Sequence, residues 1–273
     1  MIPPGFWLSG LGLIAGSALS ARWNWWRRLR PGIPILMYHK VGIPPQGSQL
    51  KKLWVSPQKF RKQMAYLSDE GYHPITFNDI YDHWDGIRPL PSKPMVITFD
   101  DGYANNYTEA YPILRDFGFR AVIFVVAQTV GWDNHWHNPK TEVRIPMISW
   151  AQLKELQKAG WEIGSHTMNH PNLTTLNLDK VRIEVEKSRR IIGEFLDEIP
   201  MTFAYSYGKG EDDPDIREIV KSTGYRLAVG VHSGKWPIEK FKTNPYQLPR
   251  VFVRGDENMV DFHLQMTRGQ SRL

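Results

Sequence analysis

Met95-Val96-Ile97-Thr98-Phe99-Asp100-Asp101-Gly102 is an apolar run that ends in two adjacent acids and a glycine. A second apolar run, residues 161–164, leads in the same way into Ser165-His166-Thr167-Met168-Asn169-His170. Side chains at the carboxyl ends of parallel strands converge on one mouth of a β/α barrel. We therefore expect the two acids and the two histidines to lie together at such a mouth.

These residue types indicate metal chemistry. One carboxylate and two imidazoles form a facial set of ligands for a divalent metal, and they leave positions open for water and substrate. The second carboxylate lies where a general base is needed. An Asp-Asp pair alone often only forms a turn, and two histidines four residues apart often lie on the surface without a function. The hypothesis therefore depends on the acid pair and the histidine pair occurring together. Together they predict a metal-assisted hydrolase.

Four helix-like stretches end in a glycine, and each glycine is followed by an aromatic residue and an apolar run. Glycine just past a helix adopts the left-handed conformation that other residues resist, and the aromatic residue then begins the next strand. The four junctions are Gly71-Tyr72, Gly118-Phe119, Gly160-Trp161 and Gly224-Tyr225. Such alternation over residues 33–253, with ligands at strand ends, predicts an α/β protein with a parallel β/α barrel in a single domain.

The expected helices have start signals and apolar faces. Ser56-Pro57, Ser149 and Asp213-Pro214 are N-cap signals. Apolar residues follow at helical spacing and predict faces that pack on the core. These residues are Phe60, Met64 and Leu67 in one helix, Leu153 and Leu156 in a second, and Val181, Val185, Ile192 and Phe195 in a longer one.

Two stretches, residues 86–94 and 131–146, look irregular. The second contains Trp132, His135, Trp136 and His137. Aromatic loops at a barrel mouth suit the faces of sugar rings. The same rings can equally pack against one another, so both interpretations stay open.

Three sequence blocks carry a resemblance to a known family. They are TFDDG at residues 98–102, SHxxxH at residues 165–170 and Phe203-Ala204-Tyr205-Ser206-Tyr207-Gly208. In this order they resemble the polysaccharide deacetylase family, also called carbohydrate esterase family 4 or the nodulation-protein-B homology domain. The resemblance covers roughly residues 33 to 253. It implies a distorted barrel of about seven parallel strands and hydrolysis of N-acetyl groups on a polymer that contains N-acetylglucosamine.

The resemblance also implies roles for individual residues. Asp101, His166 and His170 match the metal ligands, and Asp100 matches the general base. The backbone N–H of Tyr207 matches the oxyanion donor. Zn²⁺ is the expected metal, although this donor set also suits Fe, Co or Ni.

His39 is our candidate for the acid that protonates the leaving amine. It ends the apolar run Ile33-Pro34-Ile35-Leu36-Met37-Tyr38. Ordinary family members carry a similar strand and histidine near the C-terminus, whereas the exopolysaccharide branch looks circularly permuted and carries it first, as here. His232, which follows residues 227–231, is the second candidate, although the Ser-Gly after it is typical of a turn.

The block around Tyr207 departs from the family pattern. Many members have Arg-Pro-Pro-Tyr-Gly where this chain has Ala204-Tyr205-Ser206-Tyr207-Gly208, so the arginine that would orient the base is missing. Arg250, in a Leu-Pro-Arg sequence before an apolar run, is positioned to supply a guanidinium from another strand. The alternative is an ordinary surface arginine at the start of a strand.

The first 30 residues differ from the rest. Residues 6–21 are apolar, and residues 22–30 contain four arginines and three tryptophans. We interpret residues 1–30 as a membrane-targeting segment, either a signal peptide or an anchor, before a catalytic domain at residues 31–273. The positive-inside rule would favour a cytoplasmic domain, but access to an envelope polymer favours a membrane-associated or exported, extracytoplasmic enzyme.

Composition agrees with this interpretation. The formal net charge is +6, and because residues 1–30 contain four arginines and no acids, only +2 belongs to the remainder. Most of the net positive charge therefore belongs to the proposed membrane-targeting segment at residues 1–30, and nucleic acid is not an expected partner. The absence of cysteine excludes disulfides and thiolate ligands.

Three functions from different classes stay open. The leading one is a metal-dependent N-deacetylase that acts on an N-acetylglucosamine polymer. The second is an amidohydrolase of the same fold that acts on a small cyclic amide or ureide, and the third is a catalytically weak, sugar-binding relative. The membrane segment and aromatic loops favour a polymer, and the intact set of Asp100, Asp101, His166 and His170 favours an enzyme.

Overall fold

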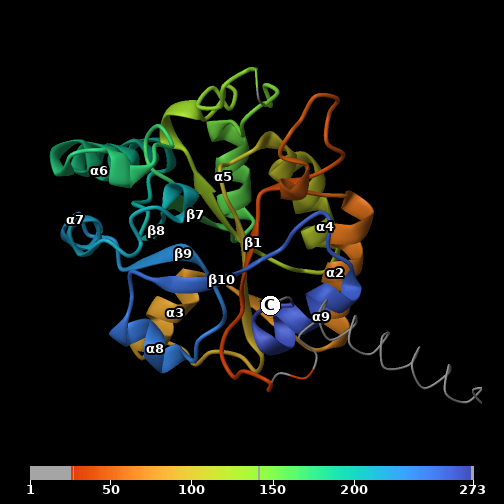
Figure 1. Cartoon of the computed structure of the whole chain (residues 1–273). Coiled ribbons are helices and arrows are strands. Elements are labelled where there is room, and N and C mark those ends of the chain that lie inside the picture. Colours follow the sequence, from red (N-terminus) through yellow and green to blue (C-terminus); the bar gives the residue numbers. More distant parts are fainter. Residues whose placement is uncertain (1–25, 27, 141, 272–273) are drawn as a thin grey trace, which may run out of the picture.

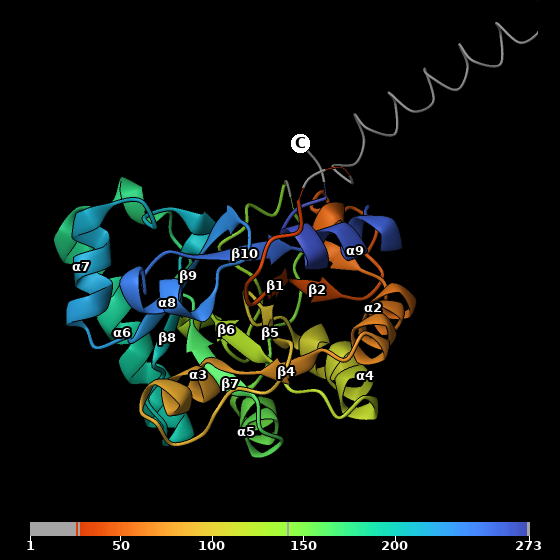
Figure 2. The ribbon, with the colours of Figure 1, turned by 90° about the horizontal axis from the view of Figure 1, so that it is seen from below.

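A closed barrel of seven parallel strands forms the centre of the computed structural model, which describes residues 26, 28–140 and 142–271 (Figures 1 and 2). Around the ring the order is β1, β10, β9, β8, β7, β6 and β5, and β5 pairs again with β1. The strands of the ring are β1 (Ile35–Tyr38), β5 (Pro94–Phe99), β6 (Val122–Val125), β7 (Glu162–Ser165), β8 (Thr202–Ala204), β9 (Leu227–Ser233) and β10 (Leu248–Phe252). This confirms the predicted parallel β/α barrel.

Strand β5 has three partners. Strand β1 pairs with it from Val96 to Phe99 along one edge. On the other edge β4 (His73–Ile75) pairs at Pro94 to Val96, and β6 pairs at Thr98 and Phe99. Strands β2 (Lys40–Val41) and β3 (Trp54–Val55) form a separate small sheet. The strand that carries the two acids is therefore held along both edges.

Helices surround the barrel in Figures 1 and 2. They are α2 (Pro57–Asp69), α3 (Phe77–Trp84), α4 (Tyr111–Asp116), α5 (Trp150–Lys158), α6 (Leu178–Leu196), α7 (Pro214–Ser222), α8 (Ile238–Thr243) and α9 (Met259–Arg268). The predicted caps are confirmed: Ser56, Ser149 and Asp213 each accept a hydrogen bond from a backbone N–H in the first turn of a helix. Each cap satisfies donors that the helix itself leaves free.

The four glycine junctions are also confirmed. Gly71, Gly118, Gly160 and Gly224 all have positive φ. After the first three, the N–H of the aromatic residue bonds back into the last turn of the helix, as Tyr72 does to the Leu67 carbonyl at 2.9 Å. This pattern reverses the chain and leads it back along the barrel.

The predicted helix faces are buried with one exception. Phe60, Met64 and Leu67 are fully buried in α2. Phe195 in α6 was predicted to face the core, but it is 47% exposed, and its ring stacks on Trp150 at 4.3 Å between centroids. That expectation was wrong because two aromatic rings on neighbouring helices cover each other outside the core.

The membrane-targeting interpretation falls on residues 1–30, almost all of which lie outside the described residues. Within the part of the chain that the structure describes, no helix has the length and apolar character needed to cross a membrane.

Candidate active site

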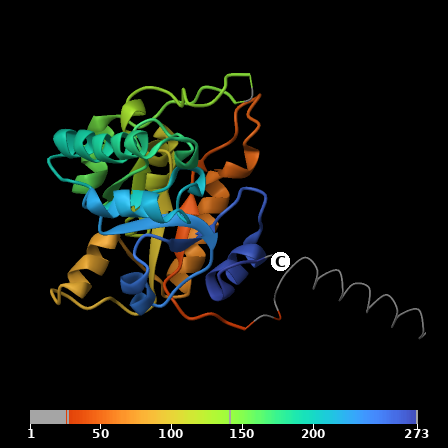
Figure 3. The ribbon, with the colours of Figure 1, turned by 60° about the vertical axis from the view of Figure 1, so that its left-hand side comes forward.

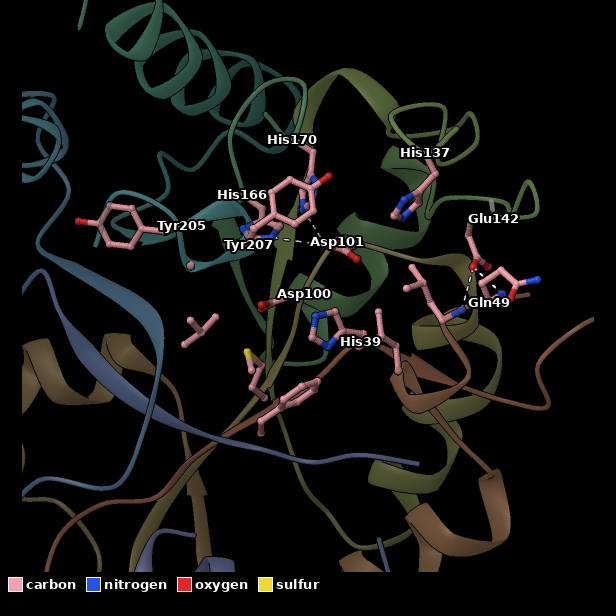
Figure 4. A pocket seen from close by; sticks show the side chains of 16 residues that line it. His39, Gln49, Asp100, Asp101, His137, Glu142, His166, His170, Tyr205 and Tyr207 are labelled. Atoms are coloured by element: carbon pink, nitrogen blue, oxygen red, sulfur yellow. Dashed lines mark hydrogen bonds and ion pairs between the residues drawn. The ribbon is translucent and has the colours of Figure 1, made fainter. Parts of the chain in front are cut away.

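Asp101, His166 and His170 meet at the mouth of the barrel, where β5 and β7 end (Figure 4). Oδ1 of Asp101 lies 3.4 Å from His166 Nε2 and 3.2 Å from His170 Nε2. One ligand atom from each residue lies within 4.8 Å of the other two, and all three side chains are buried. The structure therefore brings together the three residues predicted to hold a metal.

The hydrogen bonds around this triad fit a metal site. His166 donates from Nδ1 to the Ala204 carbonyl at 2.8 Å, which fixes the ring with Nε2 facing Asp101. Metal-binding histidines are commonly oriented in this way by a partner on the other ring nitrogen. Burial opposes the charge on Asp101, but hydrogen bonds from His166 and His170 hold the pKa of Asp101 well below its usual value. An ionised carboxylate and two imidazoles form a donor set for a divalent cation.

The loop that carries both histidines is anchored by Glu184 of α6. Its carboxylate accepts hydrogen bonds from the backbone N–H groups of Met168 and Asn169, at 3.0 and 2.8 Å, and from the Asn169 side chain. Thr167 Oγ1 accepts from the N–H of His170. Glu184 was not found from the sequence, because its role depends on the approach of a helix to a loop 15 residues away in sequence.

Asp100 is bound by Arg250. Two parallel hydrogen bonds of 2.7 Å join Nη1 and Nη2 of Arg250 to the two carboxylate oxygens of Asp100. Arg250 is only 1% exposed, and its Nε donates to the Gly230 carbonyl. The interpretation of Arg250 as a surface residue is therefore wrong, and a guanidinium from β10 does reach the expected base, Asp100, which follows β5.

This pairing sets the charge of Asp100. Burial alone would raise the pKa of Asp100, but the nearby Arg250 guanidinium, with contributions from His166 and His39, lowers it below the ordinary value. Asp100 is thus ionised at neutral pH. A bidentate arginine also fixes the plane of the carboxylate, which a lysine would not do.

His39 lies in the same cavity as the triad, whereas His232 does not. The His39 ring packs against Phe252, and its Nδ1 is buried with no hydrogen-bond partner among the described residues. Burial lowers the pKa of His39, although Asp101 and Asp100 favour its protonated form. His232 is exposed and bonds through Nε2 to Asp212 at 3.0 Å. His232 lines a neighbouring hollow and not this cavity, so the geometry supports His39 over His232 as the candidate acid.

Tyr207 lines the same cavity as the triad and has a left-handed conformation with φ of 58°. Its ring contacts the His170 ring at 4.4 Å between centroids, and in the described residues its backbone N–H donates no hydrogen bond to the chain. Gly208 permits this turn, because a Cβ there would lie 2.1 Å from Val231. An N–H that the chain leaves without an acceptor is what an oxyanion donor requires.

The cavity that contains these residues has a volume of about 520 Å³. Part of its wall comes from two loops, residues 42–53 and the described residues of 131–146 (131–140 and 142–146), which lie side by side at the mouth (Figure 3). Glu142 joins them by accepting hydrogen bonds from the Ser48 hydroxyl and from the N–H groups of Gln49 and Leu50. The sequence indicated the second loop by its aromatic residues but gave no signal for Glu142.

The aromatic residues of this loop fall into two groups. Trp136 packs its ring against Tyr103 and His170, so it supports the site in the way that the packing interpretation expected. His137 lines the cavity, and Trp132 is 74% exposed. His137 and Trp132 therefore remain available to a ligand.

Comparisons with known proteins agree with this geometry. A family model described as polysaccharide deacetylase matches residues 87–228. The chain is 28% identical over 211 residues to YxkH of Bacillus subtilis (strain 168), covering 77% of this chain and 68% of that protein. It is 27% identical over 220 residues to the poly-beta-1,6-N-acetyl-D-glucosamine N-deacetylase of Staphylococcus aureus (strain MRSA252), covering 76% and 70%.

A solved structure, that of IcaB from Ammonifex degensii, is 27% identical with a TM-score of 0.66 and covers 83% of this chain and 94% of that one. The family match spans more than half of the chain and includes both the acid pair and the histidine pair. The chain belongs to the polysaccharide deacetylase family.

Proposed function

We propose that this protein is a metal-dependent hydrolase that removes N-acetyl groups from a polysaccharide containing N-acetylglucosamine. The observation that carries the proposal is the buried Asp100–Arg250 pair beside the donor triad of Asp101, His166 and His170. A binding protein has no need of an oriented, ionised carboxylate next to a metal site. The pair therefore favours an enzyme over a sugar-binding relative.

Asp101, His166 and His170 would hold the metal, for which Zn²⁺ is our first choice and Co, Ni or Fe are alternatives. A divalent ion at this position would supply Lewis acidity and a water whose pKa is lowered to about 7. The chain must then supply a base, an oxyanion donor and an acid.

Asp100 would act as the base. Arg250 occupies one hydrogen-bonding position on each carboxylate oxygen of Asp100. Since each oxygen has two lone pairs, a further position remains for the proton of the attacking water. Arg250 keeps Asp100 ionised and oriented and is therefore a positioning residue.

The backbone N–H of Tyr207 would donate a hydrogen bond to the carbonyl oxygen as negative charge develops there. Backbone donors of this kind contribute because their orientation is fixed before the reaction begins. Here the left-handed turn at Tyr207 and the contact of its ring with His170 hold the N–H in place.

His39 would protonate the leaving nitrogen. Because burial lowers its pKa, the imidazole is mostly neutral at neutral pH in the free site, and the protonated fraction falls further as pH rises. An acid in this state donates best on the acidic side of neutrality. Activity that depends on His39 should therefore decline toward alkaline pH.

The polymer is proposed from the relatives and from the mouth of the barrel. One relative is named for poly-beta-1,6-N-acetyl-D-glucosamine, and Tyr207 and Trp132 offer half-exposed and exposed aromatic faces that suit sugar rings. A β-1,6-linked polymer is accordingly the first candidate.

Residues 1–30 would target this enzyme to the membrane, with the catalytic domain at residues 31–273 placed outside the cytoplasm. The apolar run at residues 6–21 and the arginines and tryptophans that follow support membrane targeting, and access to an envelope polymer supports the placement outside the cytoplasm. Fractionation of cells that produce the full chain or residues 31–273 alone would test this placement.

The substrate is tested by amine release from defined oligosaccharides. We expect turnover of β-1,6-linked N-acetylglucosamine oligomers and none of small cyclic amides or ureides. Turnover confined to a small amide would mean that the substrate is a small metabolite and not a polysaccharide.

The role of Asp100 is tested by Asp100→Asn. This variant should keep the metal but lose rate by a factor on the order of 10² to 10⁴, as for a lost proton-transfer group.

The metal site is tested with a matched pair of histidine variants. His170→Ala should lose most bound metal because a three-ligand site rarely tolerates the loss of one ligand. His232→Ala should retain it, since His232 bonds to Asp212 outside the site. Elemental analysis of the purified proteins provides the measurement, and a normal metal content in His170→Ala would remove that residue from the site.

The Asp100–Arg250 pair is tested by Arg250→Gln. Without the guanidinium, burial dominates and the pKa of Asp100 should rise, so the acid limb of the pH–rate profile should move toward neutrality. At neutral pH the variant should lose about 3–5 kcal/mol of stability, because an unpaired buried carboxylate remains. The loss should shrink in acid, where Asp100 becomes neutral.

Arg61→Gln is the matched control for this loss. Arg61 pairs with Asp116 at 2.6 Å, but both side chains are about half exposed. Chemical denaturation should therefore show a change below about 1 kcal/mol. Equal losses in the two variants would mean that burial of Arg250 has no special consequence.

His39→Ala separates proton donation from site shape. The variant should retain metal, lose turnover on acetamides, and lose far less on an activated aryl acetate whose leaving group needs no proton. Steady-state rates on the two substrates provide the comparison, with His232→Ala as the control. Equal losses on both substrates would mean that His39 only shapes the cavity.

A further inference from the structure

A second hollow of about 750 Å³ adjoins the active-site cavity. The two share Tyr207, Gly208 and Val231 in their linings. We call this boundary between the two hollows the shared ridge, and a polymer that crosses it can contact both. Acidic residues outnumber basic ones in the second lining, and they are Glu211, Asp212, Asp213 and Asp215. We call this second hollow the acidic groove.

Glu211 is the unusual member of the acidic groove. It is 2% exposed, and one carboxylate oxygen, Oε1, accepts a hydrogen bond from the N–H of Val231 at 3.0 Å. The other oxygen, Oε2, is buried without a hydrogen-bond partner among the described residues and lies 4.0 Å from His232 Nε2. A buried acceptor with no donor costs free energy, and positive charge beside Glu211 would lower that cost.

The backbone has adapted to this carboxylate. A Cβ on residue 230 would lie 1.5 Å from Glu211 Oε2, so only glycine permits the carboxylate to pack there. Burial raises the pKa of Glu211, and a nearby positive charge would favour its ionised form. The site is thus arranged to respond to a cation.

The other charges of the acidic groove have different roles. Asp213 caps α7 by accepting from the N–H groups of Asp215 and Ile216. Asp212 is exposed and accepts from His232 and Gln247, and the Asp215 carboxylate is exposed. Lys209 and His232 are the cationic side chains in the described lining. Four acids against these two leave an excess of negative charge beside the reaction site.

We propose that the acidic groove binds the protonated amino group of a sugar that has already been deacetylated. The proposal rests on the function proposed above, because each turnover replaces a neutral acetamide with an amine that is a cation when protonated. An ammonium carries three donors for the exposed carboxylates of Asp212 and Asp215, and its charge would stabilise the buried Glu211 carboxylate beside them.

A consequence for the polymer follows from the shared ridge. A chain that crosses Tyr207, Gly208 and Val231 places one sugar near the triad and a neighbouring sugar in the acidic groove. The enzyme should then favour partly deacetylated chains, and successive acetyl groups should be removed near those already lost.

The test compares two oligomers by isothermal titration calorimetry, at a pH below the pKa of the sugar amine. Wild-type protein should bind a β-1,6-linked glucosamine trimer more tightly at low salt than at high salt. The double variant Asp212→Asn/Asp215→Asn, altered only at exposed positions, should bind it about threefold to tenfold more weakly, because exposed ion pairs are individually weak. Binding of the N-acetylglucosamine trimer should not change.

Two further variants sharpen the result. Glu211→Gln should also weaken binding of the glucosamine trimer, because it removes the buried charge. Asp69→Asn, which removes one exposed acid at the end of α2, should have no effect. Equal affinity of wild-type and double-variant protein for the glucosamine trimer, or an equal loss in Asp69→Asn, would overturn the proposal.

Amine release from the N-acetylglucosamine trimer separates this proposal from the proposed function. The double variant should deacetylate that trimer at the wild-type rate, because neither substituted residue lies in the active-site cavity. Deacetylation without salt-sensitive binding of the amine would overturn the acidic groove alone. Binding of the amine without any deacetylation would overturn the proposed function and leave the acidic groove as a cation site.

Discussion

The site depends on the closure of the barrel by β1. This strand pairs with β10 on one side and with β5 on the other, and so joins the two ends of the sheet. Ring closure brings Arg250 of β10 within hydrogen-bonding distance of Asp100, which follows β5, although they are 150 residues apart in sequence. His39, immediately after β1, enters the same cavity. An open sheet would leave Asp100 and Arg250 near opposite edges.

Charge is the second constraint. A buried carboxylate or guanidinium is costly to remove from water, and a buried pair adds little net stability compared with apolar residues. The pair is therefore better understood as a means of orientation: Arg250 keeps Asp100 ionised and fixes its plane. The same reasoning applies to Asp101, whose negative charge depends on the two histidines around it.

Local chemistry explains which features could be predicted from sequence. The glycine junctions and helix caps depend on a few neighbouring residues, and the Asp101, His166 and His170 cluster follows from the rule that strand ends converge. The sequence left two roles open for Arg250, a partner of the base or a surface arginine, because its partner is set by ring closure. Glu142, Glu184 and Glu211 act through loops and helices whose approach leaves no sequence pattern.

The three partners of β5 have a consequence for dynamics. Backbone amides in this strand are held by β1 along one edge and by β4 and β6 along the other, so they should exchange with solvent only when the whole barrel opens. The loops joined by Glu142 depend on three hydrogen bonds and can separate far more readily. The two acids that follow β5 therefore belong to a persistent part of the molecule, whereas the cavity wall formed by the two loops is more adaptable.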